Sequence, residues 1–182
     1  MIDLNPTLRK ARDFGADAAA MISTGDVVFV EEFRAACEMN TCGHYGKNWM
    51  CPPAVGEPGV LRERLLAFER GVVMQTVHRL EDSFDVDGMR AGREKHEVVF
   101  RRMFAHVQSI AGEGDFLALN VGAWKYCEEC AFVREEPCRY PDKAVASLEA
   151  YCIDVNALLT ACGIPYNNGV NTVSYVSLIL FM

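Results

Sequence analysis

The 182-residue sequence lacks the long apolar runs of a membrane protein. A transmembrane helix needs about 20 consecutive apolar residues, whereas the longest apolar stretch here is the short segment from Val176 to Met182. The first twenty residues also lack a basic segment followed by an unbroken apolar one, because charged residues interrupt them. We therefore expect a cytoplasmic protein that makes no membrane contact.

Basic residues are also in deficit. The chain has 18 Lys and Arg against 25 Asp and Glu, which gives a formal net charge of -7. Binding to a phosphate backbone requires clustered basic side chains. The most basic segment, from Arg90 to Arg102, is interleaved with Glu94 and Glu97, a pattern typical of a solvated helix face. Nucleic acid is therefore not an expected partner.

Two groups of sequence motifs are missing as well. There is no glycine-rich phosphate loop of the G-x-G-x-x-G or Walker type. No local signature assembles a Ser, His and Asp catalytic set. The sequence thus indicates neither nucleotide binding nor triad hydrolysis.

What the sequence does contain is eight cysteines, six of them in two triplets. The first triplet has the spacing C-x4-C-x8-C and is followed by Pro52 and Pro53, and the second has the spacing C-x2-C-x7-C. The two triplets are Cys37, Cys42 and Cys51, and Cys127, Cys130 and Cys138. A disulfide framework is typical of small secreted chains that cannot build a core. A chain of this length with 51% hydrophobic residues can bury a core without cross-links, so we interpret the thiols as metal ligands.

Thiolates select zinc, copper(I) or iron–sulfur clusters over hard cations. A structural zinc site usually uses four ligands in two C-x2-C knuckles, and only Cys127 and Cys130 have that spacing. Iron–sulfur clusters accept wider spacing, and proline often follows a cluster cysteine, as Pro52 follows Cys51. The spacing therefore favours one or two [4Fe-4S] clusters, with zinc as the alternative cofactor.

The pattern around the cysteines resembles the DUF2284 family of predicted metal-binding proteins. The residues that carry the resemblance are Cys37, Cys42, Tyr45, Gly46, Trp49, Cys51, Pro52, Pro53, Cys127, Cys130, Cys138, Arg139, Pro141, Ser147, Glu149, Ala150, Ile153, Asp154 and Val155. The resemblance implies a cytoplasmic, cysteine-rich protein whose thiols bind metal. The chain departs from the family pattern at Ala146, where a proline is usual, and at Cys152, where a glycine is more familiar.

Alternation of helical and strand patterns predicts a single α/β domain over residues 1–182, with a mixed or largely parallel sheet and flanking helices. The cysteine-rich loops fall at about 37–59 and 122–142 and follow strands. Elements are expected at residues 6–14, 60–70, 89–111 and 147–162 for helices and at 18–22, 27–30, 72–77, 116–121 and 173–181 for strands.

Six further residues are candidates of lower specificity. His44 lies beside Cys42 and is a possible extra ligand, although a simple loop role is equally consistent with its position. Cys152 and Cys162 fall on the apolar stripe of the helix expected at 147–162, so we interpret them as core residues. Lys47, Lys125 and Arg139 could offset the charge of a cluster.

Six ligands in two groups of three leave one iron of each cluster without a cysteine, whereas full ligation favours electron transfer. We expect an iron–sulfur protein that passes electrons to a redox partner protein. One alternative is an enzyme that activates a small-molecule substrate at an open cluster iron. The other is a structural zinc module that mediates interactions.

Overall fold

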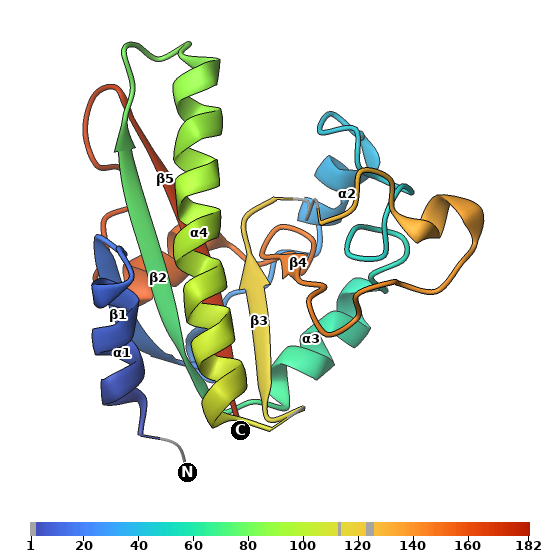
Figure 1. Cartoon of the computed structure of the whole chain (residues 1–182), viewed down its shortest axis with the longest axis horizontal. Coiled ribbons are helices and arrows are strands. Elements are labelled where there is room, and N and C mark those ends of the chain that lie inside the picture. The colour runs from blue at the N-terminus through green and yellow to red at the C-terminus, as the bar shows by residue number, and fades with distance from the viewer. Residues whose placement is uncertain (1–2, 113, 123–125) are drawn as a thin grey trace.

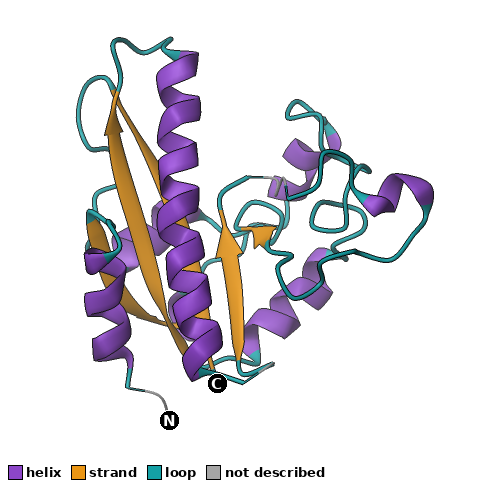
Figure 2. Ribbon diagram, in the orientation of Figure 1, coloured by secondary structure: helices purple, strands orange, loops and turns teal. Residues whose placement is uncertain are grey.

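The computed structural model describes residues 3–112, 114–122 and 126–182. These residues form five α-helices, two short 3-10 helices and five strands (Figures 1 and 2). The helices are α1 (Leu4–Asp13), α2 (Phe33–Glu38), α3 (Pro58–Leu66), α4 (Val86–Ile110) and α5 (Val155–Ala161), with the 3-10 helices η1 (Thr24–Asp26) and η2 (Ala131–Arg134). The strands are β1 (Ala18–Ser23), β2 (Arg70–Arg79), β3 (Phe116–Asn120), β4 (Ala146–Ser147) and β5 (Thr172–Phe181).

The strands form one open, mixed sheet in the order β1-β2-β5-β3-β4. The pairs β1–β2, β2–β5 and β3–β5 are antiparallel, and β3–β4 is parallel. The predicted α/β class with helices flanking a mixed sheet is therefore confirmed. The largely parallel arrangement that the sequence also allowed is not the one formed, because β2 and β5 pair antiparallel over ten residues each.

Helices cover both faces of the sheet, because neighbouring residues of a strand point to opposite sides. Val72 of β2 packs in one core with α1 and α4, whereas Val73 packs in the other core with α3 and α5. Ile179 and Leu180 of β5 divide in the same way. Strands buried on both faces explain why β2 and β5 appear in the sequence as nearly continuous apolar runs.

Two predicted elements were wrong. Residues 27–30 do not form a full strand: Phe29 makes an isolated bridge to Ile153. The chain leaves the sheet at η1, and the Val30 amide donates to the Cys152 carbonyl (2.8 Å). The helix expected at 147–162 begins only at Val155, because Cys152 adopts a left-handed backbone conformation (φ 57°) that interrupts a helix.

Three of the α-helices begin at an aspartate cap, among them α4 and α5. Asp85 accepts a hydrogen bond from the Gly88 amide (2.8 Å) and begins α4. Asp154 accepts one from the Ala157 amide (2.9 Å) and begins α5. Among the described helices, none is both long enough and apolar enough to cross a membrane.

Candidate metal centre

The two cysteine-rich loops lie side by side at one end of the molecule, beyond β3, β4 and α3 (Figure 1). The first loop continues from α2, which carries Cys37. The second carries η2, which follows directly after Cys130. Segments about ninety residues apart in sequence thus meet in one region, and the chain brings all six predicted ligands to it.

The thiols of the first triplet affect one another electrostatically. Burial raises the pKa of the Cys51 thiol, a hydrogen bond with Asn48 lowers it, and Cys42 and Cys37 raise it further through their charge. Cys51 is buried, Cys37 is half-buried and Cys42 is exposed. The triplet therefore spans the depth of the loop, from the protein interior to the surface.

Cys37 has two further neighbours that the sequence did not indicate. Burial raises the pKa of its thiol, and the charge of Arg34 opposes that effect. Cys152 also raises the pKa of Cys37, and its effect is larger than that of Cys42. Glu149 acts in the same direction. The first triplet thus borders the turn that connects β4 to α5.

Arg34 holds the first loop and the β4–α5 turn together. Its guanidinium donates to the carbonyls of Gly56 (3.0 Å) and Ala150 (3.2 Å), so it links α2, the end of the first loop and the β4–α5 turn. The Nε atom of Arg34 is buried and has no hydrogen-bond acceptor within the described residues. Arg34 therefore places a cation with one unused donor beside Cys37.

Local turns shape the first loop. Gly43 and Gly46 have left-handed backbone conformations (φ 74° and 64°), which glycine adopts without a steric penalty. Their amides donate to the carbonyls of Asn40 (2.9 Å) and Pro52 (2.8 Å). The Asn40 side chain also accepts from the Tyr45 amide (3.0 Å). The two glycines thus serve the turns that return the chain to Cys51.

The second triplet gathers around one small cavity. Cys127, Cys130 and Cys138 are all half-buried and line a space of about 40 Å³. The other lining residues are Tyr126, Tyr140 and Ala144 from the same part of the chain and Asn48, Trp49 and Met50 from the first loop. This is the clearest convergence of predicted ligands among the described residues, because all three cysteines of a triplet line one cavity.

Trp49 joins the two loops. Its indole Nε1–H donates to the Glu136 carbonyl (3.0 Å). Its ring packs edge-on against Phe132, with 5.0 Å between centroids. The tryptophan therefore lies between the two triplets and holds the second loop against the first.

Lys143 supplies a cation beside the second cavity. Its ammonium donates to the Tyr126 hydroxyl (3.0 Å), and this hydrogen bond raises the pKa of Lys143. The same ammonium lies over the rings of Tyr126 (5.0 Å) and Tyr140 (5.7 Å). Both rings line the cavity. The Lys143 ammonium therefore contacts two of the side chains that surround the second triplet.

The family model for "Predicted metal-binding protein (DUF2284)" matches residues 20–181, nearly the whole chain. The chain belongs to the DUF2284 family. The match includes all six cysteines of the two triplets and the turn that carries Glu149 and Cys152. No curated protein and no solved structure matches the chain.

In this DUF2284 protein, all eight cysteines are free thiols. Across residues 3–112, 114–122 and 126–182, no three His, Cys, Asp or Glu side chains lie close enough together to hold a single metal ion. The chemistry of the donors nevertheless fits a group bound by several thiolates, because three soft ligands line one cavity and three more belong to the adjoining segment.

The remaining candidates lie around these two sets. His44 is half-buried in the first loop, and its role as a ligand stays a prediction. Arg139 pairs with Glu136 (3.7 Å) and donates to the Glu129 carbonyl (3.4 Å). Lys125 lies outside the described residues. Cys162 ends α5, and burial raises the pKa of its thiol to about 11.

A buried polar network connects the second loop to the sheet core. The Lys143 carbonyl accepts from Arg101 (3.1 Å), which pairs with Glu97 (2.7 Å). Glu97 also accepts from the Asn120 amide (2.6 Å) at the end of β3. Sequence reasoning placed Arg101 and Glu97 on a solvated helix face. Both side chains are instead substantially buried, with 24% and 34% of their surface exposed.

Proposed function

We propose that this DUF2284 protein binds one or two [4Fe-4S] clusters through its two cysteine triplets and passes electrons to a partner protein. The observation that supports this most directly is the cavity shared by Cys127, Cys130 and Cys138. Three thiolates that line one cavity would suit three irons of a cluster. The first triplet would hold a second cluster through Cys37, Cys42 and Cys51.

Several groups of the chain would assist such a cofactor. Arg34 and Lys143 place positive charge beside the first and second triplets, which would offset the negative charge of a thiolate-bound cluster and tune its potential. The unused Nε–H of Arg34 is a donor that a sulfide or thiolate would satisfy. Trp49 lies between the two loops and would shield both sites from water.

The electronic chemistry would come from the cluster, which accepts and donates single electrons when bound. The thiols would have to lose their protons first. Burial raises the pKa of Cys37 and of Cys51, so loading would release protons and weaken as the pH falls. Free thiols favour a reducing compartment such as the cytoplasm. The acidic surface, with a net charge of -7, would favour docking to a basic face of the redox partner.

Metal analysis tests the proposal. Protein purified without oxygen is expected to contain iron and acid-labile sulfide in comparable amounts and to give an EPR signal on reduction. Zinc in stoichiometric amount with no sulfide would overturn the iron–sulfur assignment and leave a structural zinc module.

Cysteine variants then count the sites. Cys37→Ala and Cys130→Ala are each expected to remove about half of the iron if the triplets act separately. Cys162→Ala is the matched control, because this thiol ends α5 and belongs to neither triplet. Loss of the whole EPR signal from Cys37→Ala alone would contradict two independent clusters. A change in the EPR spectrum on adding a small molecule would instead favour the enzyme with an open iron.

A further inference from the structure

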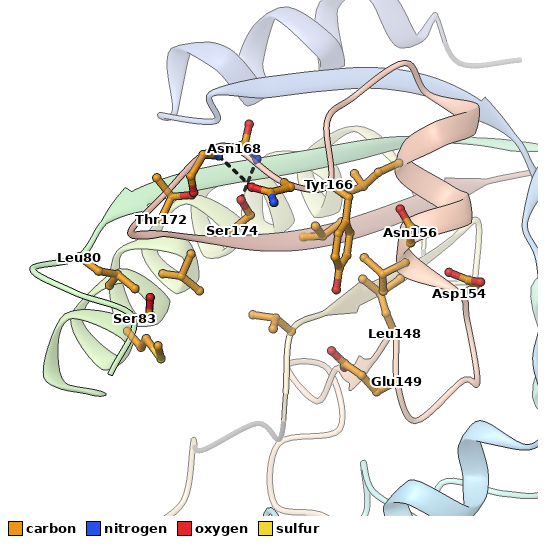
Figure 3. Close-up of a pocket in the computed structure, with 18 of the residues that line it drawn as sticks. Leu80, Ser83, Leu148, Glu149, Asp154, Asn156, Tyr166, Asn168, Thr172 and Ser174 are labelled. Atoms are coloured by element: carbon orange, nitrogen blue, oxygen red, sulfur yellow. Dashed lines mark hydrogen bonds between the residues drawn. The ribbon is translucent and has the colours of Figure 1, made fainter. Parts of the chain in front are cut away.

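A wide pocket among the described residues contains none of the six predicted ligand cysteines. It has a volume of about 990 Å³, at the upper end of the usual range for ligand sites. It lies between the first half of β5, the start of α5 and the turn at 148–154 (Figure 3). We call it the β5 pocket.

The floor of the β5 pocket is apolar. Leu148, Leu159 and Val176 line it and are almost fully buried beneath it. Tyr166 extends its ring over the pocket toward Leu148 (Figure 3), and 59% of this residue remains exposed. The floor therefore offers an apolar body a surface to pack on, and Tyr166 offers an aromatic face beside it.

One wall of the pocket is preorganised by hydrogen bonds. The Asn168 side-chain amide donates to Ser174 Oγ (2.9 Å) and to the Pro165 carbonyl (3.2 Å). The link between Asn168 and Ser174 is drawn in Figure 3. Because these bonds fix the amide of Asn168, the loop before β5 presents polar groups in a defined arrangement.

The charged residues that line the pocket are all acidic. Glu149 and Asp154 line it, and no Lys, Arg or His does so within the described residues. Asp154 accepts the capping hydrogen bond of α5 through Oδ1, so its second carboxylate oxygen can accept from a ligand. The Glu149 carboxylate makes no hydrogen bond within the part of the chain that the structure describes. The pocket therefore repels anions and attracts cations.

We propose that the β5 pocket binds a small organic cation, with an ammonium or amidinium group at Glu149 and Asp154 and an apolar body on Leu148 and Val176. Tyr166 adds an aromatic face that favours a cation. The proposal goes beyond electron transfer, because no predicted cysteine ligand lines the pocket. The charge of Glu149 also raises the pKa of Cys37 and Cys51, so this side of the pocket faces the region of the first triplet.

Titration with three matched probes tests this proposal. The full chain is titrated with 2-phenylethylammonium, 2-phenylethanol and 3-phenylpropanoate at equal ionic strength, and backbone amide shifts are followed by NMR. We expect the shifts of Tyr166, Asn168 and Ser174 to respond, with the cation bound more tightly than the alcohol and the anion bound least. Equal affinity for the three probes, tighter binding of the anion, or no response of these amides at millimolar concentration would overturn the proposal.

Charge-removing variants locate the contact. Glu149→Gln is expected to weaken binding of the cation by about threefold to tenfold and to leave binding of the alcohol unchanged. Asp154→Asn keeps the cap of α5, because asparagine is an equally good N-cap. This variant should also bind the cation more weakly than the parent protein does. Glu63→Gln is the control, since it makes the same change in net charge on the exposed surface of α3. An equal loss of cation affinity in the Glu63→Gln protein would refute a direct contact between the cation and Glu149. Iron and sulfide content of the same samples reports separately on the proposed cofactor.

Discussion

His96 provides a test of the buried polar network that can be worked out atom by atom. Because Glu97 can only accept, Asn120 turns its amide nitrogen toward it (2.6 Å) and its oxygen toward the Ser177 hydroxyl (2.7 Å). Ser177 therefore donates to Asn120 and accepts from His96 Nε2 (2.6 Å). Nδ1 of His96 faces Thr76 Oγ1 (2.8 Å), which donates to it when the ring is neutral. The network thus fixes one proton on Nε2, and burial of the ring favours the neutral form that carries only this proton.

Burial determines how strongly the folded protein favours the neutral ring of His96. His96 is fully buried, and burial together with the charge of His78 lowers its pKa from 6.5 to about 4. Below about pH 6.5 the unfolded chain takes up a proton at this residue that the folded protein does not accept. The free energy of unfolding therefore falls on acidification. The part of that fall due to His96 is about 2 kcal/mol between about pH 7 and about pH 5.

Two measurements check this expectation. Side-chain NMR should show the ring of His96 as the neutral Nε2–H tautomer down to about pH 5, with the signal assigned by its absence in His96→Gln. Urea unfolding should show a drop in stability from about pH 7 to about pH 5 that is smaller by about 2 kcal/mol in His96→Gln than in the parent protein. The comparison cancels the contribution of His78, whose pKa is also lowered by burial. A His96 ring that titrates above about pH 6, or equal pH dependence of the two proteins, would refute the reasoning.

Two smaller predictions concern packing. Gly71→Ala should lower the free energy of unfolding by roughly 3 kcal/mol, because a Cβ there would lie 2.4 Å from the Ile179 carbonyl oxygen. Gly59→Ala, where a Cβ meets nothing within 4 Å, should instead raise it by about 0.5 kcal/mol in the same urea titration. Trp49→Phe loses the hydrogen bond to Glu136 (3.0 Å) and should cost about 1 kcal/mol. It should also speed proteolysis at residues 128–140, and an unchanged cleavage rate would contradict its role in joining the loops.

The fold was predictable where local signals sufficed. The helix predicted at 89–111 corresponds to α4, and the apolar runs of β2 and β5 lie in the middle of the sheet. The prediction failed at residues 27–30, where the β-branched and aromatic run suggested a strand. That segment bonds to residues 152–154, more than a hundred positions later, through the amides of Val30 and Asp154. No local pattern indicates such a partner.

The candidate metal centre was likewise predictable only in part. Cysteine spacing alone indicated which six thiols belong together, and the cavity around Cys130 agrees with the second group. Spacing could not indicate Arg34 or Lys143, because each acts through neighbours far along the chain: Arg34 bonds to Ala150, and Lys143 to Tyr126. It also could not reveal the β5 pocket, whose walls come from separate turns.

Cys152 shows how a local departure from the family pattern acquires a structural meaning. It holds a left-handed conformation (φ 57°) that costs a non-glycine residue roughly 1 kcal/mol, and glycine, the more familiar residue of the family there, adopts it freely. The thiol is buried and lies near Cys37. If it only fills the core, Cys152→Gly should keep the iron content and exceed Cys152→Ala in stability, since alanine retains the unfavourable conformation. We expect that outcome, with six cysteine ligands. Loss of iron in both variants, as large as in Cys37→Ala, would instead make Cys152 the fourth thiolate of the first triplet, and a cluster there would have no open iron.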